Sequence, residues 1–351
     1  MIIYKVYFKS FKIIEETKVI GNTKGRRRFF YKACGVLLGT GAMLMGSGAS
    51  ATGQYPNRPI TIVVPFAPGG ASDMTARLIG ERLGEKLGQT VVIENRAGAN
   101  SQIGTNSVIR AEPDGYTLLL GTTSLINNPF LYRNLPYDAA KQLRPVVGLV
   151  DVPAFLTVGS KLNVKNAAEF LDLARKSNGS LNYSSAGTGS TLHLAAEWLK
   201  SAGGFDALHI PQRGSGPSVI AVASGEVDFS MENYGPAKAQ IDGNRLKMIA
   251  VASPARFPAL PDVPTFKEVG LPDVDLSSWF VIMAPAKVPD DVVNVLNKNI
   301  NDILAEPDVR ERLISIGLVP LGGSPADLQK RMESDAANWG AIIRSANVKV
   351  E

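Results

Sequence analysis

The chain has 351 residues, of which 45% are hydrophobic and 20% are charged, so it is long enough to bury sizeable cores without disulfide bonds. Its net charge of +5 comes from the N-terminal segment. Residues 1–51 hold nine of the 37 Lys and Arg residues and two of the 32 Asp and Glu residues. Residues 52–351 therefore have 28 basic and 30 acidic residues, a net charge of −2. The basic balance therefore gives no support to nucleic-acid binding, and we expect no nucleic-acid partner.

Residues 1–51 predict a cleaved export signal. Three arginines, Arg26 to Arg28, precede the glycine-rich apolar run 33–49, and residues 49–51 fit a small-residue cleavage site. The run is too short and too rich in glycine for a good membrane span. The arginines resemble a twin-arginine signal, but Tyr31 stands where a lysine is usual, so ordinary Sec export stays an alternative.

The single cysteine, Cys34, lies inside this predicted signal and in a poor lipobox, so we expect no lipid anchor. An export signal on a chain whose remaining residues lack cysteine indicates a periplasmic protein of a bacterium.

After the signal, strands and helices alternate. Residues 60–64 predict a buried strand, and an amphipathic helix follows that ends near Gly88, a glycine cap. Strands at 90–94 and 116–120, with a helix at 102–110 between them, complete a βαβαβ unit. Such a unit indicates an α/β fold with a doubly wound, mostly parallel sheet.

A second unit of the same kind begins at 154–158. Its expected elements are helices and strands in the order 167–176, 181–183, 191–200, 217–223, 227–230 and 246–251, the last being a strand that returns toward the first half. The C-terminal third is expected to be mainly helical, at 290–304, 307–316 and 325–345, the last helix starting with an N-cap at Ser324 and a proline at its first position.

These patterns predict two lobes with a ligand cleft between them. We expect the first lobe to comprise residues 52–153 and 253–351 and the second lobe residues 154–252. The two crossing segments, near Val152 and Ser253, would form a hinge. In open α/β sheets, small ligands bind at the carboxyl ends of the strands.

The turn after the first strand is the most informative segment. Gly69 and Gly70 would let the backbone approach a ligand, and the following helix start offers unpaired N–H groups to a carboxylate or phosphate. Asp73 would hold the turn and favour the helix dipole. The alternative is a tight turn whose glycines serve only sterics.

A second glycine-rich turn, at 184–190, also leads into a predicted helix. Its hydroxyl and N–H groups could hold an oxyanion, or they could serve only as ordinary helix caps. The segment is not a dinucleotide fingerprint, because Leu192 replaces the third glycine, and it lacks the lysine of a P-loop.

Three more loops could add contacts. Thr122 and Thr123 end a predicted strand, Arg213 precedes a helix and could pair with a carboxylate, and Glu232 with Asn233 follows another strand. Each has an ordinary structural alternative: a strand-end turn, a surface arginine and a carboxylate that orients nearby N–H groups.

The sequence offers little for catalysis. His193 and His209, the only histidines, have no metal-ligand spacing, and no Gly-x-Ser-x-Gly elbow is present, so we expect no enzyme, no metal and no cofactor. His193 is expected to be a packed or capping histidine. We expect the tryptophans to be packing residues, with Trp279 the best candidate to lie by the cleft.

Residues 65–77 strongly resemble the signature of the Bug-type substrate-binding proteins of tripartite tricarboxylate transporters. The resemblance extends over nearly all of residues 52–351, through 94–99, 113–117, 187–190 with His193 and Leu194, and 258–265. It implies a periplasmic binding protein that closes on a small organic acid, a mono- or dicarboxylate, and delivers it to membrane permease subunits. We expect it to act as a monomer.

The resemblance also implies where the ligand is held. The first turn would hold a carboxylate through backbone groups and water, and the second lobe would sort ligands. The expected ligand-binding residues are Phe66, Ala67, Pro68, Gly69, Gly70, Ser72, Asp73, Thr122, Thr123, Ser185, Ala186, Gly187, Thr188, Gly189, Ser190, Arg213, Gly214, Ser215, Glu232 and Asn233. Gln212 and Glu232 depart from the tyrosine and aspartate that are frequent in the family, so the ligand of no relative carries over.

Two other functions stay open at this point. A periplasmic sensor or adaptor would bind a ligand in the same way and pass its closed form to a signalling partner. A hydrolase or transferase would use the glycine turns for a phosphorylated substrate, and the absence of an obvious base and of metal ligands in the sequence counts against it.

Overall fold

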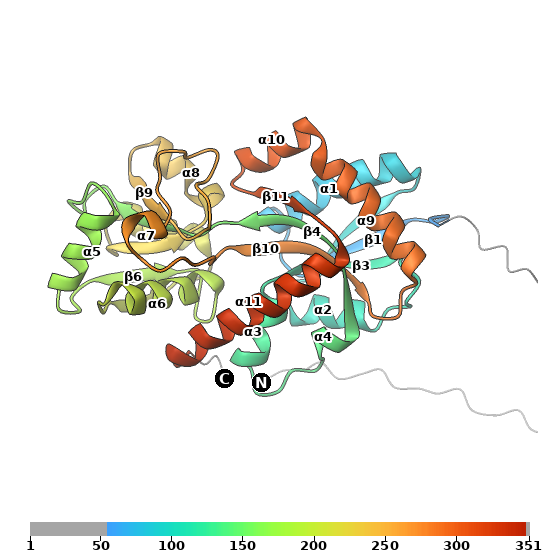
Figure 1. Cartoon of the computed structure of the whole chain (residues 1–351), viewed down its shortest axis with the longest axis horizontal. Helices are drawn as coiled ribbons and strands as arrows, with labels where there is room; N and C mark the ends of the chain where they lie inside the picture. Colours follow the sequence, from blue (N-terminus) through green and yellow to red (C-terminus); the bar gives the residue numbers. More distant parts are fainter. Residues whose placement is uncertain (1–54, 349–351) are drawn as a thin grey trace, which may run out of the picture. The chain divides into compact units, whose positions relative to one another are not determined.

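The structure is a computed structural model that describes residues 55–348. The predicted export signal, with Cys34, lies outside the described residues. Residues Thr52–Glu351 form one compact unit, which contains two β-sheets flanked by helices (Figure 1).

The first sheet has six strands in the order β11-β4-β10-β3-β1-β2. Its strands are β1 (Ile60–Val64), β2 (Val91–Asn95), β3 (Thr117–Thr122), β4 (Leu143–Val152), β10 (Ser278–Pro285) and β11 (Val319–Gly322). β1 pairs in parallel with β2 and β3, whereas β10 is antiparallel to β3 and β4, and β11 is antiparallel to β4.

The second sheet has five strands in the order β7-β6-β8-β5-β9. Its strands are β5 (Phe155–Gly159), β6 (Asn182–Ser185), β7 (Leu208–Pro211), β8 (Phe229–Glu232) and β9 (Leu246–Val251). β6 pairs in parallel with β7 and β8, and β5 is antiparallel to β8 and β9.

Both sheets are therefore mixed, and the expectation of mostly parallel sheets was wrong in this respect. The antiparallel pairs arise at the crossings between the sheets, because β4 runs directly into β5 through Pro153 and Ala154 and β10 returns alongside β4 (Figure 1). The strand at 246–251 is an edge strand of the second sheet rather than part of the first.

The predicted helices at 167–176, 290–304 and 325–345 agree closely with the structure. α1 ends at Gly88 in the left-handed conformation, as expected, and Ser324 forms a capping box with Asp327 at the start of α11. The α-helices of the described residues are α1 (Ala71–Leu87), α2 (Gln102–Ile109), α3 (Ser124–Leu131), α4 (Ala139–Gln142), α5 (Ala167–Lys176), α6 (Thr191–Gly203), α7 (Ser215–Ser224), α8 (Tyr234–Asp242), α9 (Asp290–Ala305), α10 (Pro307–Ser315) and α11 (Pro325–Ser345). A 3₁₀ turn, η1, covers Lys267–Val269.

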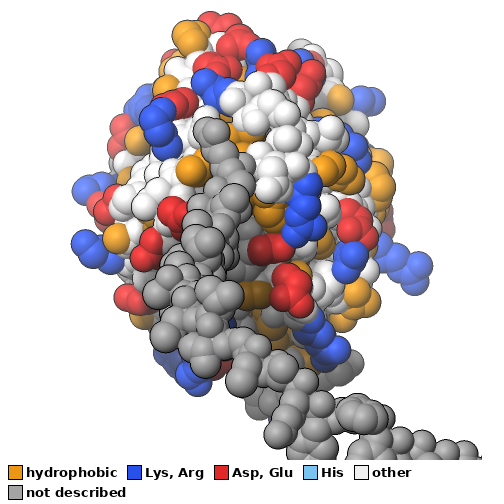
Figure 2. All heavy atoms as spheres, turned by 90° about the vertical axis from the view of Figure 1, so that its right-hand side faces the viewer, with side chains coloured by type: hydrophobic (Ala, Val, Ile, Leu, Met, Phe, Trp, Pro, Cys, Tyr) orange, Lys and Arg blue, Asp and Glu red, His pale blue; other side chains and the backbone are white. Residues whose placement is uncertain are grey.

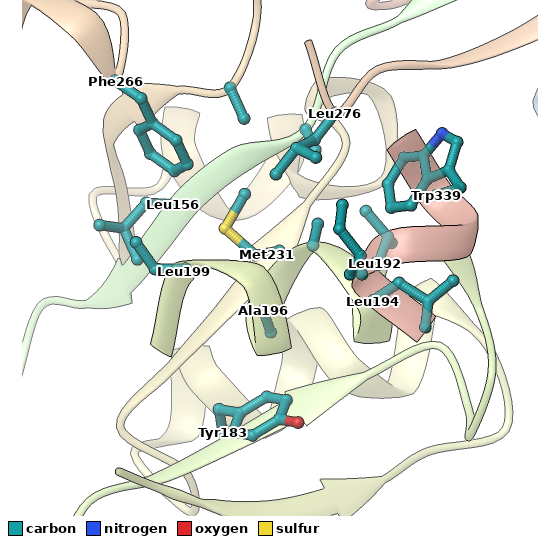
Figure 3. Close-up of a cluster of buried hydrophobic side chains, with 14 of the residues drawn as sticks. Leu156, Tyr183, Leu192, Leu194, Ala196, Leu199, Met231, Phe266, Leu276 and Trp339 are labelled. Carbon is teal, nitrogen blue, oxygen red and sulfur yellow. The ribbon is translucent and has the colours of Figure 1, made fainter. Parts of the chain in front are cut away.

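The helices cover the two sheets and form hydrophobic cores with them; one core lies against the first sheet, and another contains residues of both sheets. α1 and α9 pack Ile79 and Leu296 into the core beneath β1 and β4. Another core extends from the second sheet to α11, and Figure 3 shows Trp339 of α11 beside Leu192 of α6. The contact between α6 and α11 connects a helix that packs on the second sheet to a helix that packs on β4 of the first sheet.

Trp279 is a packing residue. It is fully buried, and its Nε1–H donates to Asp335 of α11 at 3.0 Å. Trp198 stacks on Phe266 and Trp339 is in the core, so the expectation that the tryptophans serve packing is confirmed; that Trp279 lies by the cleft stays a prediction.

Acidic and basic side chains are intermixed on the visible part of the face in Figure 2. Within residues 55–348, no helix combines the length and the apolar character that crossing a membrane requires.

Candidate ligand-binding site

The loops predicted to bind the ligand follow neighbouring parallel strands. In the first sheet Val63 pairs with Leu119, so Phe66 after β1 lies level with Thr122 at the end of β3. In the second sheet Ser184 pairs with Ser230, so the loop after β6 lies beside the end of β8. The topology thus brings the sequence-predicted residues of each half to one sheet edge.

The turn at residues 66–73, called the first turn below, is held by the buried side chain of Asp73. One carboxylate oxygen of Asp73 accepts from the Gly69 N–H at 3.0 Å and from Nε of Arg77 at 3.0 Å, and the other accepts from Nδ2 of Asn95 at 2.9 Å. The hydrogen bond from Arg77 is the main cause that lowers the pKa of Asp73 to about 2. Asp73 therefore holds the turn as expected, and its negative charge is compensated by the guanidinium of Arg77.

The backbone of the first turn faces solvent. Residues 67–70 are exposed, and Gly69 has a φ of +86°, which favours glycine. Gly70 is the N-cap residue of α1 and gives the helix no side-chain cap, so the N–H groups of the first turn of α1 keep no side-chain partner there. This is the backbone arrangement that binds carboxylates and phosphates at helix starts.

The end of β3 carries a compact set of hydroxyl groups. Thr122 Oγ1 and Ser124 Oγ lie 2.8 Å apart, and both side chains are buried. Thr123 is the N-cap residue of α3 and makes no side-chain cap bond. Its hydroxyl instead shares a hydrogen bond of 3.1 Å with the hydroxyl of Thr191, the first residue of α6, and so connects the helix starts of the two halves.

The loop at residues 185–190, called the glycine loop below, has its own internal support. Gly187 and Gly189 have φ angles of +128° and +77°. The Gly187 N–H donates to Ser185 Oγ at 3.1 Å, and the Gly189 N–H donates to Nδ1 of His193 at 3.1 Å. Ser190 caps α6 by accepting from the His193 N–H at 3.2 Å, so the expected capping role is present in this loop.

Arg213 and its neighbours lie at the start of α7. Arg213 is exposed, and among the described residues its side chain makes no hydrogen bond or ion pair, so its guanidinium is free to meet a ligand. Gly214 has a φ of +115° and is the N-cap residue of α7, which begins at Ser215 and lacks a side-chain cap. α1, α3 and α7 thus all begin without a side-chain cap at the predicted site.

Glu232 and Asn233 are placed differently from the exposed loops. Glu232 is 0% exposed, and neither of its carboxylate oxygens has a well-formed hydrogen bond. Burial raises the pKa of Glu232 to about 8, against the opposing effect of the nearby hydroxyls of Ser218, Ser215 and Ser230. Asn233 donates its Nδ2–H to the Pro153 carbonyl at 2.9 Å, at the crossing between the sheets.

Three further residues belong to this region and were not predicted. Asn95 bridges the Phe66 carbonyl and Asp73, and its place in the 94–99 motif could have indicated a role. Thr191 follows the glycine loop directly. Asn127, in the first turn of α3, is buried with its Oδ1 unpartnered, and no sequence signal pointed to it.

Two other features of the described residues bear on the site. Within residues 55–348, no group of three or more His, Cys, Asp or Glu side chains could hold a metal ion. An apolar pocket of about 410 Å³ lies between α3, α4 and α11, and none of the predicted ligand-binding residues lines it; Phe130, Leu143 and Met332 are among its lining residues. A carboxylate would find few partners there.

Comparison with known proteins decides the family. The sequence profile of the tripartite tricarboxylate transporter family receptor, TctC, matches residues 75–348. The chain belongs to this TctC, or Bug, family of periplasmic solute-binding proteins. It is accordingly a binding protein of the two-lobed α/β fold and not an enzyme, as the sequence predicted.

Curated relatives agree with this assignment. A UPF0065 protein encoded in the tcbD-tcbE intergenic region of Pseudomonas sp. (strain P51) is 38% identical over 290 residues, 82% of this chain and 86% of the relative. The protein BugT of Bordetella pertussis (strain Tohama I) is 33% identical over 299 residues, 85% of this chain and 92% of BugT.

Two solved structures of the family are also similar. A protein of R. palustris with adipate has a TM-score of 0.76 and 34% identity, covering 84% of this chain and 100% of that structure. MatC from Rhodopseudomonas palustris with bound malate has a TM-score of 0.71 and 31% identity, covering 82% of this chain and 100% of that structure.

Proposed function

We propose that this protein captures a small mono- or dicarboxylate in the periplasm by closing two lobes around it, and hands the ligand to the permease subunits of a tripartite tricarboxylate-type transporter. The observation that carries the proposal is the set of helix starts without side-chain caps, α1, α3 and α7, which follow the carboxyl ends of β1 and β3 in the first sheet and of β7 in the second. Unpaired N–H groups and positive dipole ends favour a bound carboxylate.

The proposed ligand contacts divide between the lobes. The exposed backbone of the first turn would hold one carboxylate directly, with Asp73 and Asn95 keeping the turn in shape. The glycine loop and Arg213 would contact the rest of the ligand and decide which acid is preferred. Glu232 would affect the ligand only indirectly, through the start of α7, because its side chain is fully buried.

The proposed lobes are residues 52–153 with 253–351 and residues 154–252. The membership of the strands in the two sheets supports this division, because β1 to β4, β10 and β11 belong to one sheet and β5 to β9 to the other. Residues 1–51 are proposed to direct export and to be removed, as the arginine-rich and apolar segments of the sequence indicate.

The chemistry of the relatives narrows the ligand class. The solved relatives hold adipate and malate, which are both small dicarboxylates. Gln212 and Glu232 lie where we expect the ligand to be sorted, so this chain would prefer its own acid within that class.

Isothermal titration calorimetry tests the proposal with a panel of aliphatic and aromatic mono-, di- and tricarboxylates, acidic amino acids, sugars and phosphate esters. We expect at least one carboxylate to bind with a Kd of roughly micromolar or below, which corresponds to about −8 kcal/mol. Binding of sugars alone, with no response to any acid, would refute the proposed ligand class. Co-purification with permease subunits rather than a sensor ectodomain tests the proposed partner.

A further inference from the structure

We propose that His193 and His209 are a pair of positioning residues that hold the glycine loop in its ligand-binding conformation, and that this conformation requires the imidazole of His193 to be neutral. The inference deepens the proposed function, on which it rests only for the statement that the glycine loop meets a ligand. It predicts that acid pH releases the loop.

The two histidines are the only ones in the chain, and the fold stacks them face to face. His193 lies in the first turn of α6 and His209 in β7, with ring centroids 4.0 Å apart and an interplanar angle of 13°. The ring of Tyr183 in β6 lies near both imidazoles, with centroid distances of 4.8 Å to His209 and 6.3 Å to His193. Two neutral rings can stack at this distance, whereas two imidazolium cations would repel each other.

His193 supports the glycine loop through one ring nitrogen. Its Nδ1 accepts from the Gly189 N–H at 3.1 Å, so Nδ1 must carry a lone pair and the ring proton must be on Nε2. A second proton on the ring would go to Nδ1 and would face the Gly189 N–H directly. Protonation of His193 therefore breaks the hydrogen bond that fixes Gly189.

His209 supports the other end of the loop through Ser185. Its Nε2 lies 2.7 Å from Ser185 Oγ, and the same hydroxyl accepts from the Gly187 N–H at 3.1 Å. The Ser185 hydroxyl hydrogen has two acceptors within reach, Nε2 of His209 and the Gly187 carbonyl at 3.2 Å, so His209 can either accept from Ser185 Oγ or donate to it. A charged His209 would donate to Ser185 Oγ and would place a positive charge against the ring of His193, which opposes protonation of His193.

Among residues 55–348, the carboxylate that acts on the pair, Glu197, is already paired and so offers a charged ring little stabilisation. Glu197 and Lys200, both on α6, form an ion pair of 2.9 Å, and Glu197 also accepts from the Tyr183 hydroxyl. Burial is the main cause that lowers the pKa of both histidines, and the pKa of His209 falls to about 4, with a contribution from His193. Because the unfolded chain binds these protons near pH 6.5, the stability that the neutral pair contributes is complete above that pH and is lost between pH 6.5 and 4.

The first measurement needs no ligand. NMR would follow the Cε1–H signals of the two histidines from pH 7.5 to 4, together with amide hydrogen exchange at Gly187 and Gly189, corrected for the intrinsic pH dependence of exchange. We expect the Gly189 amide to lose protection at least about tenfold, equivalent to one pKa unit, in step with protonation of the histidines. The proposal would be overturned if the histidines titrated near pH 6.5. It would also be overturned if the protection of the Gly189 amide did not change as the histidines became protonated.

Matched variants separate positioning from mere packing. In His193→Asn the side-chain oxygen can still accept near the Nδ1 position but cannot titrate, so Gly189 should stay protected down to pH 4.5. His193→Leu fills space without an acceptor and should lose that protection at every pH. Equal behaviour of the two variants would argue for packing alone.

Two controls complete the design. His209→Gln removes the second titrating ring while His193 keeps its contact with Gly189, so protection of Gly189 should still be lost in step with protonation of His193; this variant decides the question if the His193 variants fail to fold. Glu197→Gln should leave the pH dependence in place; its disappearance would assign the effect to Glu197. Failure of every carboxylate to bind at pH 7 would defeat the proposed function and leave these ligand-free results valid.

Discussion

The hydroxyl groups of Thr123 and Thr191 lie 3.1 Å apart and join the start of α3, after a strand of the first sheet, to the start of α6, after a strand of the second. The two residues are 68 positions apart in the chain. Their hydrogen bond is a direct polar link between the loops that we propose to close on a ligand.

This link should stabilise the ligand-bound state. Thr123→Val and Thr191→Val each keep the shape of the side chain and remove the hydroxyl, so we expect the Kd for the carboxylate that binds the parent best in the calorimetric panel to be about fivefold higher, consistent with a hydrogen bond worth about 1 kcal/mol. The double variant should be little weaker than either single variant, because both remove the same bond. Calorimetry of the four proteins measures this coupling, and fully additive losses would show that the bond does not contribute to binding.

The first turn should depend on access to its backbone. Gly70 has a φ of −80°, and an added Cβ would meet no atom within 4 Å, so Gly70→Val should fold normally. It would place a branched side chain beside the proposed carboxylate position, and we expect the affinity for the carboxylate that binds the parent to fall at least about tenfold, or 1.4 kcal/mol. Circular dichroism checks the fold.

Arg213→Ala is the matched variant on the second lobe. Arg213 is exposed and has no protein partner among the described residues, so its loss should weaken binding by only about 1 kcal/mol or less and should change the order of preference among acids. If Arg213→Ala abolished binding while Gly70→Val bound as tightly as the parent, the carboxylate would be held by an arginine clamp instead.

Asp73 should support the first turn in a pH-dependent way. Its pKa of about 2 lies below the ordinary value of 3.8, chiefly because of the hydrogen bond from Arg77, so its contribution to stability is present above pH 3.8 and is lost as the pH falls through 2. Asp73→Asn should lower the free energy of unfolding by about 1–3 kcal/mol at pH 7. Denaturant titrations at pH 7 and pH 3 should show the difference from the parent shrinking at the lower pH.

Glu232 should have the opposite pH dependence. Its pKa is raised to about 8 by burial, so ionisation costs stability progressively as the pH rises from 4.5 to 8. Glu232→Gln removes this cost and should be more stable than the parent by at least about 1.4 kcal/mol at pH 8.5, with little difference at pH 4.5. A constant difference across this range, measured by denaturant unfolding, would contradict a buried, titrating Glu232.

The export route can be tested in cells. Replacing Arg26, Arg27 and Arg28 with lysine preserves the positive charge of the segment but removes the arginine pair. We expect the variant to be retained in the cytoplasm if the twin-arginine route is used. Normal export of the variant would assign the protein to the Sec route and leave the periplasmic location unchanged.

Much of the local structure could be predicted from the sequence, because it depends on neighbouring residues. The amphipathic pattern after Gly70, the glycine at Gly88 and the Ser324 cap act within one helix, and the structure contains these features. The glycines of the first turn and the glycine loop indicated the proposed site for the same reason.

The missed strands required distant partners. β10 and β11 each pair with β4 across long separations in the chain, and the apolar runs of these strands alone do not reveal direction or order. Hence the sheets are mixed, whereas the alternation of strands and helices predicted mostly parallel sheets. Likewise, the sequence does not show that Trp279 is buried with its Nε1–H donating to Asp335.

The features of the proposed site likewise separate into those that the sequence predicts and those that appear only in the folded structure. The sequence by itself determined the α/β fold, the family resemblance and the glycine turns, since short motifs and periodic patterns carry that information. Only the tertiary structure decided that Thr123 meets Thr191, that His193 stacks on His209, and that Glu232 is buried without a partner. These relationships depend on how separate elements pack, because desolvation and hydrogen bonding between distant residues exist only once the chain is folded.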